Sequence, residues 1–136
     1  MKLSVKTIYG IKALLEIATH NGSEVNSAEI AKAQKVPVKF LEQILAILKR
    51  NKLVVSSRGP SGGYLLAKQP KAITLFDVVE LLDGTISLTA NLKKGNNLQV
   101  VLQGIEGKLI AELKIVTLED LAEEKARETG VLLYNI

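Results

Sequence analysis

Residues 36–64 constrain the fold of this 136-residue chain more than any other stretch. Apolar residues recur at helical spacing over 37–51 and polar residues fill the opposite face, which predicts an amphipathic helix. Two short apolar segments, 53–57 and 64–67, then flank a basic, glycine-rich connection at 58–63. This pattern predicts a two-stranded hairpin with a basic tip. A helix with a polar face beside such a hairpin is typical of a winged helix on duplex DNA.

A second helix is expected immediately before this one. Ser27 is a favourable N-cap for a helix over 28–34. A two-residue turn then leads to Pro37, which suits a first helical position because its missing N–H needs no partner there. Two short helices so closely joined predict a helix-turn-helix whose second helix reads DNA.

The N-terminal residues predict a helix over 5–20 that ends at the Asn21–Gly22 pair. Its expected apolar face consists of Ile8, Ile11, Leu15 and Ala18. Backbone N–H groups are unpaired at a helix start, so this end could hold a phosphate with help from Lys2 and Lys6. An ordinary solvated helix start is the alternative.

The second half predicts three further segments. Thr74 and Asp77 match a capping pattern that opens a helix through Leu82. Residues 84–97 lack a sustained period and predict a linker or loop, with a possible extended piece at 86–88. A second capping pattern at Thr117 predicts an acidic helix to about residue 128, stopped by glycine. The expected fold is therefore mainly α with a small β-hairpin: a winged helix-turn-helix domain over 1–83, a linker over 84–97, and helices over 98–136.

One apolar stripe runs for about five turns along the residues after the linker. Its members are Leu98, Leu102, Ile105, Leu109, Leu113 and Val116. A single small domain cannot easily bury so long a stripe, so we expect it to pair with the same helix of a second copy. Gly104 and Gly107 lie inside this helix, where each glycine lowers helix stability by about 1 kcal/mol relative to Ala. They permit close backbone approach or mark a kink.

Composition limits the chemistry available to the chain. It has no cysteine and one histidine, which excludes disulfides, thiolate metal sites and cysteine-ligated iron–sulfur clusters, and leaves an enzyme without an evident nucleophile and base. No apolar run approaches the length of a membrane span, and no signal peptide is visible, so we expect a cytoplasmic protein without cofactor or membrane partner. Residues 1–72 carry 12 Lys and Arg against four Glu, and residues 73–136 carry six against ten acidic residues. A basic N-terminal half favours a polyanionic partner.

Residues spread over nearly the whole chain follow the pattern of a known family, most specifically in the RGPxGGY loop beside FLEQ. They are Tyr9, Ala13, Leu14, Glu29, Ile30, Ala31, Phe40, Leu41, Glu42, Gln43, Ile44, Leu45, Leu48, the residues 58–64, Thr74, Asp77, Val78 and the residues 117–121. In these residues the chain resembles the bacterial winged-helix regulators that include IscR, NsrR and CymR. The resemblance implies a dimeric transcription factor, usually a repressor, whose dimer forms through a long helix near the C-terminus.

The resemblance also implies roles for individual residues. Lys39, Glu42 and Gln43 would face the major groove, and Arg58 at the wing tip would enter the minor groove. A glutamine can pair with adenine and a glutamate can accept from cytosine, although both could be solvated surface residues. The expected DNA-binding set is Lys2, Ser4, Lys6, Tyr9, Ser27, Lys39, Glu42, Gln43, Arg58, Gly59, Pro60, Ser61, Gly62, Gly63 and Tyr64.

Some relatives hold an iron–sulfur cluster through three cysteines in the segment that matches residues 84–97. This chain has none and resembles the cluster-free branch, whose members respond to a partner protein or a small metabolite. The expected function is a homodimeric, sequence-specific repressor on a pseudo-palindromic double-stranded operator. An effector would bind between the DNA-binding part and the long helix, or a regulatory protein would take its place. The alternatives are a winged helix that binds an acidic protein surface, and an RNA-binding protein.

Overall fold

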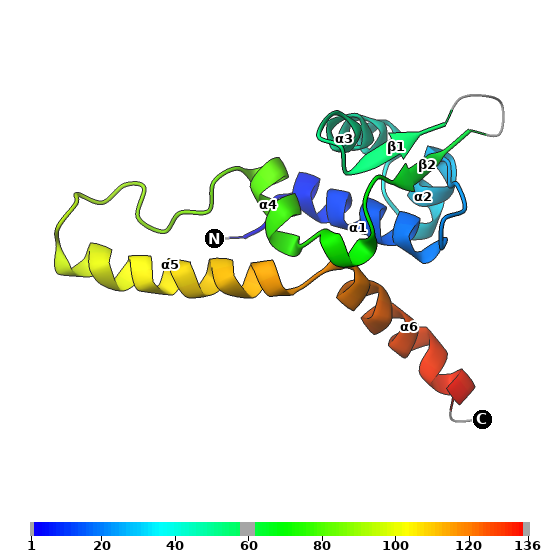
Figure 1. Cartoon of the computed structure of the whole chain (residues 1–136). Helices are drawn as coiled ribbons and strands as arrows, with labels where there is room; N and C mark the ends of the chain where they lie inside the picture. Colours follow the sequence, from blue (N-terminus) through cyan, green and yellow to red (C-terminus); the bar gives the residue numbers. More distant parts are fainter. Residues whose placement is uncertain (1, 58–61, 135–136) are drawn as a thin grey trace.

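A computed structural model describes residues 2–57 and 62–134, with side chains through residue 128. The described elements confirm a mainly α fold with one small hairpin (Figure 1). In chain order they are α1 (Val5–Thr19), α2 (Ser27–Gln34), α3 (Val38–Arg50), β1 (Val54–Ser56), β2 (Tyr64–Leu66), the 3-10 turn η1 (Pro70–Ala72), α4 (Leu75–Asp83), α5 (Asn97–Ile115) and α6 (Leu118–Tyr134).

Helix α1 lies at the centre of the fold and contacts α2, α3, α4, α6 and β2. Its buried residues include Ala13, Leu14 and Ile17, whereas Ile8 is 37% exposed. The predicted apolar face of α1 was therefore confirmed at Ala18, which is buried, and at Ile11, which packs against the core, but it was wrong at Ile8, because the buried face is centred on Ala13, Leu14 and Ile17. The reason is close packing by small residues: a Cβ at Gly10 would overlap the side chain of Leu82, so α4 lies directly against the helix there.

The hairpin is shorter than predicted and pairs β1 with β2 in antiparallel register. A third segment joins the hairpin at the end next to its connecting loop, because Val25 forms an isolated bridge with Tyr64, the partner of Ser56. The Tyr64 N–H donates to the Val25 carbonyl at 2.8 Å, and the Val25 N–H donates back at 3.2 Å. The bridge fixes the hairpin against the connection between α1 and α2.

The same bridge explains where α2 begins. Asn26 is the N-cap, and its side-chain oxygen accepts from the Glu29 N–H at 2.8 Å, so the expected cap at Ser27 was wrong. Because Val25 is held extended by Tyr64, the chain can turn into the helix one residue earlier than the sequence predicted. Pro37 similarly stands at the N-cap of α3 rather than in its first turn.

The C-terminal elements begin inside the core of the N-terminal ones. The capping box of Thr74 and Asp77 is present at α4, as predicted. The Leu118 N–H donates to the Ile73 carbonyl at 2.9 Å, next to a bridge between Thr74 and Thr117, and Leu118 is fully buried. The start of α6 is thus fixed to the start of α4. The division into residues 1–83 and 98–136 stays a prediction.

The segment 84–96 runs from α4 away from this core, and the long helix α5 returns to the core alongside it (Figure 1). The Leu88 N–H donates to Glu106 Oε1 at 2.7 Å, and the Gly95 N–H donates to Gln99 Oε1 at 2.6 Å. The expected extended piece at 86–88 forms no strand. Helix α6 continues through residue 130, so its predicted end near residue 128 was also wrong.

A buried carboxylate connects three helices in this core. Glu16 of α1 accepts a hydrogen bond from Gln34 Nε2 of α2 at 2.9 Å and one from Lys125 Nζ of α6 at 3.2 Å, and lies 3.0 Å from His20 Nε2. Burial raises the pKa of Glu16, but the hydrogen bonds from these three side chains outweigh it, so the pKa lies below its usual 4.5. The ionised form is therefore the one that stabilises the fold.

We expect Glu16→Gln to lower the free energy of unfolding at pH 7 on the order of 1–3 kcal/mol, because it removes the charge from a hydrogen-bonded buried site. A carboxyl with a depressed folded pKa stabilises above the unfolded pKa, and this contribution is lost as pH falls through the folded pKa. The difference from wild type should then shrink below about pH 4.5. Urea unfolding at a series of pH values measures it, with the exposed Glu24→Gln as control. An equal difference at every pH would contradict the assignment.

Candidate nucleic-acid interface

Helix α3 presents a polar face to solvent because its opposite face is fixed in the core. Its fully buried residues are Leu41, Ile44, Leu45 and Leu48. The polar residues Lys39, Glu42 and Gln43, predicted to face DNA, are all exposed. The helix can therefore offer charged and amide side chains to a partner while its packing holds it rigidly.

The predicted site residues gather in two groups around the start of α3. Ser27 of α2 lies next to Glu42, with its Oγ 3.5 Å from Glu42 Oε1. On the other side of the helix, Tyr9 of α1 makes an edge-to-face contact with Phe40, the ring centres lying 5.5 Å apart. The fold thus brings α1, α2 and α3 together at one end of the reading helix.

The start of α1 is already partly occupied from within the chain. The Oγ of Ser4 accepts from the Thr7 N–H at 3.1 Å and caps the helix. The Ser4 N–H donates to Asp83 Oδ2 at 3.1 Å. Hydrogen bonding to Ser4, opposed in part by burial, and the charge of Lys6 hold the pKa of Asp83 below its usual value. Ser4 therefore has a structural role here, and Lys2 and Lys6 remain the candidates for a phosphate at this end.

The base of the wing shows why a glycine stands at position 63. Four predicted DNA-binding residues, Arg58, Gly59, Pro60 and Ser61, lie outside the described residues. Gly63 is buried, and a Cβ there would lie 2.8 Å from the carbonyl carbon of Val25. Its N–H donates to the Oγ of Ser57 at 3.0 Å. Close packing inside the chain thus already requires Gly63, whereas its predicted contact with DNA stays a prediction.

We expect Gly63→Ala to destabilise the protein by roughly 1–3 kcal/mol, because the new methyl group meets rigid backbone that cannot give way. Thermal or urea unfolding measures the loss. Gly104→Ala is the matched control: a Cβ there meets nothing within 4 Å in the chain, and alanine favours the helix by up to about 1 kcal/mol. Equal stability of Gly63→Ala and wild type would show that the wing base is not tightly packed.

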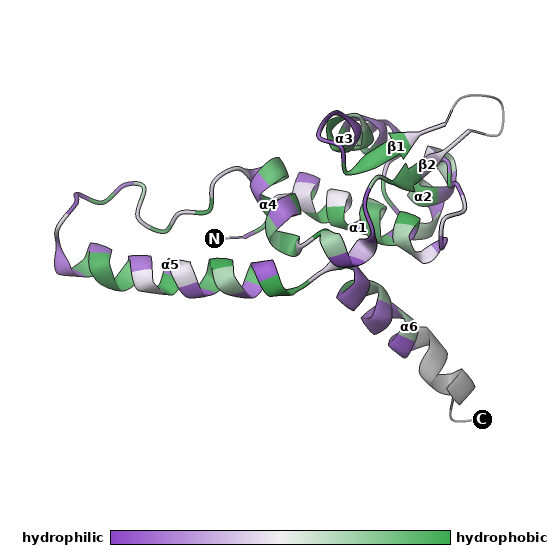
Figure 2. Ribbon diagram, in the orientation of Figure 1, coloured by the Kyte–Doolittle hydropathy of each residue, from purple (hydrophilic) through white to green (hydrophobic). Residues whose placement is uncertain are grey.

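The apolar stripe of α5 is incompletely covered in the single chain. Leu98 is 56% exposed and Ile105 is 49% exposed, while Leu102, Leu109, Leu113 and Val116 are half-buried. Figure 2 shows hydrophobic and hydrophilic residues alternating along this helix, away from the core. The sequence pattern missed the exposed Val100, Val101 and Ile115, which lie outside the stripe.

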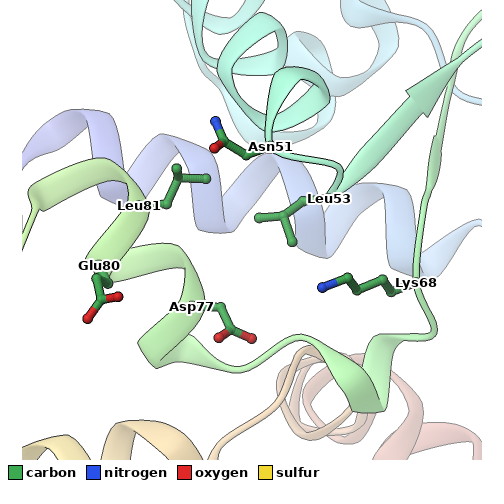
Figure 3. A pocket seen from close by; sticks show the side chains of 6 residues that line it. All are labelled: Asn51, Leu53, Lys68, Asp77, Glu80 and Leu81. Atoms are coloured by element: carbon green, nitrogen blue, oxygen red, sulfur yellow. The ribbon is translucent and has the colours of Figure 1, made fainter.

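A separate hollow of about 440 Å³ lies at the far end of α3 from the reading residues. Lys68 points across it toward Asp77, with Glu80 further along α4 (Figure 3). Asp77 is engaged, since its Oδ2 accepts from the Thr74 N–H at 3.0 Å. No residue of α5 lines this hollow, so the expected effector site between the DNA-binding part and the long helix stays a prediction.

Two classes of feature are absent from the part of the chain that the structure describes. None of its helices is both long and apolar enough to cross a membrane. No three His, Cys, Asp or Glu side chains come together there in a way that could hold a metal ion.

Comparison with known proteins identifies relatives of nearly the whole chain. A family model described as Rrf2, iron-dependent transcriptional regulator, matches residues 3–124. The HTH-type transcriptional regulator IscR of Yersinia pestis is 38% identical over 90 residues, covering 65% of this chain but only 55% of the relative. The structure of CymR, the global cysteine regulator of B. subtilis, matches with a TM-score of 0.82 at 32% identity, over 91% of this chain and 98% of that one. The T. potens IscR structure gives 0.76 at 30% identity, over 92% and 88%.

The family description names iron, so the side chains of this chain can be compared with the ligands that iron–sulfur clusters use. Protein-bound iron–sulfur clusters are held mainly by cysteine thiolates. This chain has no cysteine and a single histidine. Its donor atoms therefore do not fit a cysteine-ligated cluster.

Proposed function

Because the chain belongs to the Rrf2 family of transcriptional regulators, we propose that it is a homodimeric, sequence-specific repressor that binds double-stranded DNA in the cytoplasm without an iron–sulfur cluster. The exposed polar face of α3, fixed in orientation by four buried leucine and isoleucine side chains, carries the proposal. A rigid helix that presents Lys39, Glu42 and Gln43 is suited to the major groove, where the base pairs differ in their donors and acceptors.

At this surface the amide and carboxylate side chains would have a different role from the basic side chains. Gln43 can donate to N7 and accept from N6 of adenine, and Glu42 can accept from N4 of cytosine. Glu42 also repels phosphates, so its place beside Lys39 favours selective over indiscriminate binding. Lys39, Lys49 and Arg50 supply charge that attracts the phosphate backbone without reading sequence.

Dimerisation would give the site its symmetry. The apolar stripe of α5 is only half covered in the single chain, and the same stripe of a second copy would cover it. Two reading helices related by a two-fold axis then meet two half-sites about one helical turn, or a multiple of it, apart. The operator is accordingly expected to be pseudo-palindromic. A small-molecule effector or a regulatory protein would control this binding.

Gln43→Ala tests the reading role. We expect it to lose about 1–3 kcal/mol of binding free energy on the cognate operator and much less on unrelated duplexes, because only a base contact distinguishes sequences. Lys6→Ala is the matched comparison and should weaken binding to all duplexes alike. Fluorescence anisotropy at fixed salt, beginning with the promoter of its own gene, measures both.

Two results would count against the proposal. Equal losses on cognate and unrelated DNA for Gln43→Ala would remove this residue from sequence reading. If no duplex binds, while an acidic protein surface does, the wing and α3 form a protein-binding module instead.

A further inference from the structure

A second hollow, of about 480 Å³, lies directly beside the reading residues. It opens between the start of α1 and the start of α3. Two of its lining residues, Lys39 and Gln43, end in a charged or an amide group. The other lining residues are apolar or aromatic: Val5, Tyr9, Pro37 and Phe40. An apolar depression thus adjoins the amide proposed to contact adenine.

The walls of this hollow are apolar surface that folding leaves in solvent. Val5 is 60% exposed and Phe40 is 36% exposed, although both belong to helices with well-buried opposite faces. The edge-to-face contact between Tyr9 and Phe40 holds one wall in place. The hollow is therefore partly pre-formed, with an apolar interior and a basic residue, Lys39, among its lining residues.

We propose that this hollow is a subsite for the methyl-bearing edge of a thymine, next to the adenine contacted by Gln43. The inference rests on the proposed function. In the major groove thymine presents its C5-methyl group and the O4 acceptor, while cytosine presents an amino donor and no methyl group. An apolar wall favours the methyl-bearing base, as aromatic and aliphatic side chains commonly do.

The surroundings of the hollow favour DNA over another apolar occupant. The amide of Gln43 can hold an adenine by two hydrogen bonds, and Lys39 can contact a phosphate of the backbone. These contacts would place a base pair over the hollow, so that the methyl-bearing edge of the thymine meets its apolar walls. Phe40 therefore adds preference for A·T pairs to the reading by Gln43.

Single thymines in a selected operator can be replaced by deoxyuridine, which pairs with adenine identically but lacks the methyl group. The ratio of dissociation constants for the uracil and thymine duplexes then isolates the methyl contact. For wild type we expect a ratio of about four at one or two positions per half-site, since burying one such group contributes about 0.8 kcal/mol. Phe40→Ala should bring the ratio to one at those positions.

Val55→Ala is the matched control, because Val55 is an exposed apolar residue of β1 that does not line the hollow. It should keep the wild-type ratio. Each ratio compares two duplexes with one protein preparation, so a partly unfolded variant does not imitate the effect. If Phe40→Ala fails to fold, Val5→Ser at the 60% exposed wall replaces it and should lower the ratio.

The outcomes separate this inference from the proposed function. Specific binding of the operator without a methyl effect at any thymine would overturn the subsite alone. So would a ratio of four that survives in both Phe40→Ala and Val5→Ser. Failure of wild type to bind any duplex would overturn the proposed function and the subsite together.

Discussion

Replacing Ile105 with glutamate is expected to turn the protein into a monomer that binds its operator between about 10²- and 10⁴-fold more weakly. Ile105 lies in the middle of the α5 stripe and is 49% exposed in the single chain. A buried carboxylate at the centre of a helix pair would lack a partner and would strongly disfavour association. Loss of the dimer removes the second half-site contact, which is the source of the affinity loss.

Sedimentation equilibrium measures the mass and anisotropy measures the affinity. Gln103→Glu adds the same charge to an exposed position elsewhere on α5 and should leave both unchanged. Because Ile105 is half exposed, the variant should keep the secondary structure of wild type. A dimeric Ile105→Glu protein with full affinity would show that copies associate through another surface.

The second large effect is expected at the junction of α5 and α6. Leu118 is fully buried and belongs to the core cluster that also contains Leu14 and Ile73. Truncation to alanine removes apolar contacts and leaves a cavity, which typically lowers the free energy of unfolding by about 2–5 kcal/mol. We expect a loss in this range for Leu118→Ala in urea unfolding.

The matched control is Leu3→Ala, at a leucine that is 42% exposed. Exposed substitutions away from special contacts usually change stability by no more than about 0.5 kcal/mol. A Leu118→Ala protein as stable as this control would contradict the placement of the α6 start inside the core.

Local chemistry was sufficient to predict the elements whose signals lie within a few residues. The capping pair of Thr74 and Asp77, the amphipathic helix α3 and the hairpin were each predicted and are found. Each depends on spacing within a single segment, because caps, periodicity and strand character act over one or two turns. The family resemblance is likewise confirmed over residues 3–124.

Contacts between distant segments decided what the sequence could not. The rotation of α1 depends on Gly10 facing Leu82, 72 positions later. The start of α2 depends on the pairing of Val25 with Tyr64. In each case a local rule offered an acceptable answer, and packing against a remote segment selected another.

The candidate site likewise has some features that the local sequence predicts and others that depend on distant segments. The exposure of Lys39, Glu42 and Gln43 follows from the period of α3 and was predictable. The hydrogen bond from the Ser4 N–H to Asp83 joins residues 79 positions apart, so the sequence near either residue could not predict it. The apolar hollow beside Gln43 also needs two helices brought together, so its walls could not be identified from either helix alone.

Selection of genomic DNA fragments by the purified protein tests the proposed dimeric reading of DNA most directly. The recovered fragments are expected to share an inverted repeat whose half-sites are separated by about one helical turn or a multiple of it. Recovery of fragments without a common motif, or with a single unrepeated one, would contradict a two-fold symmetric regulator.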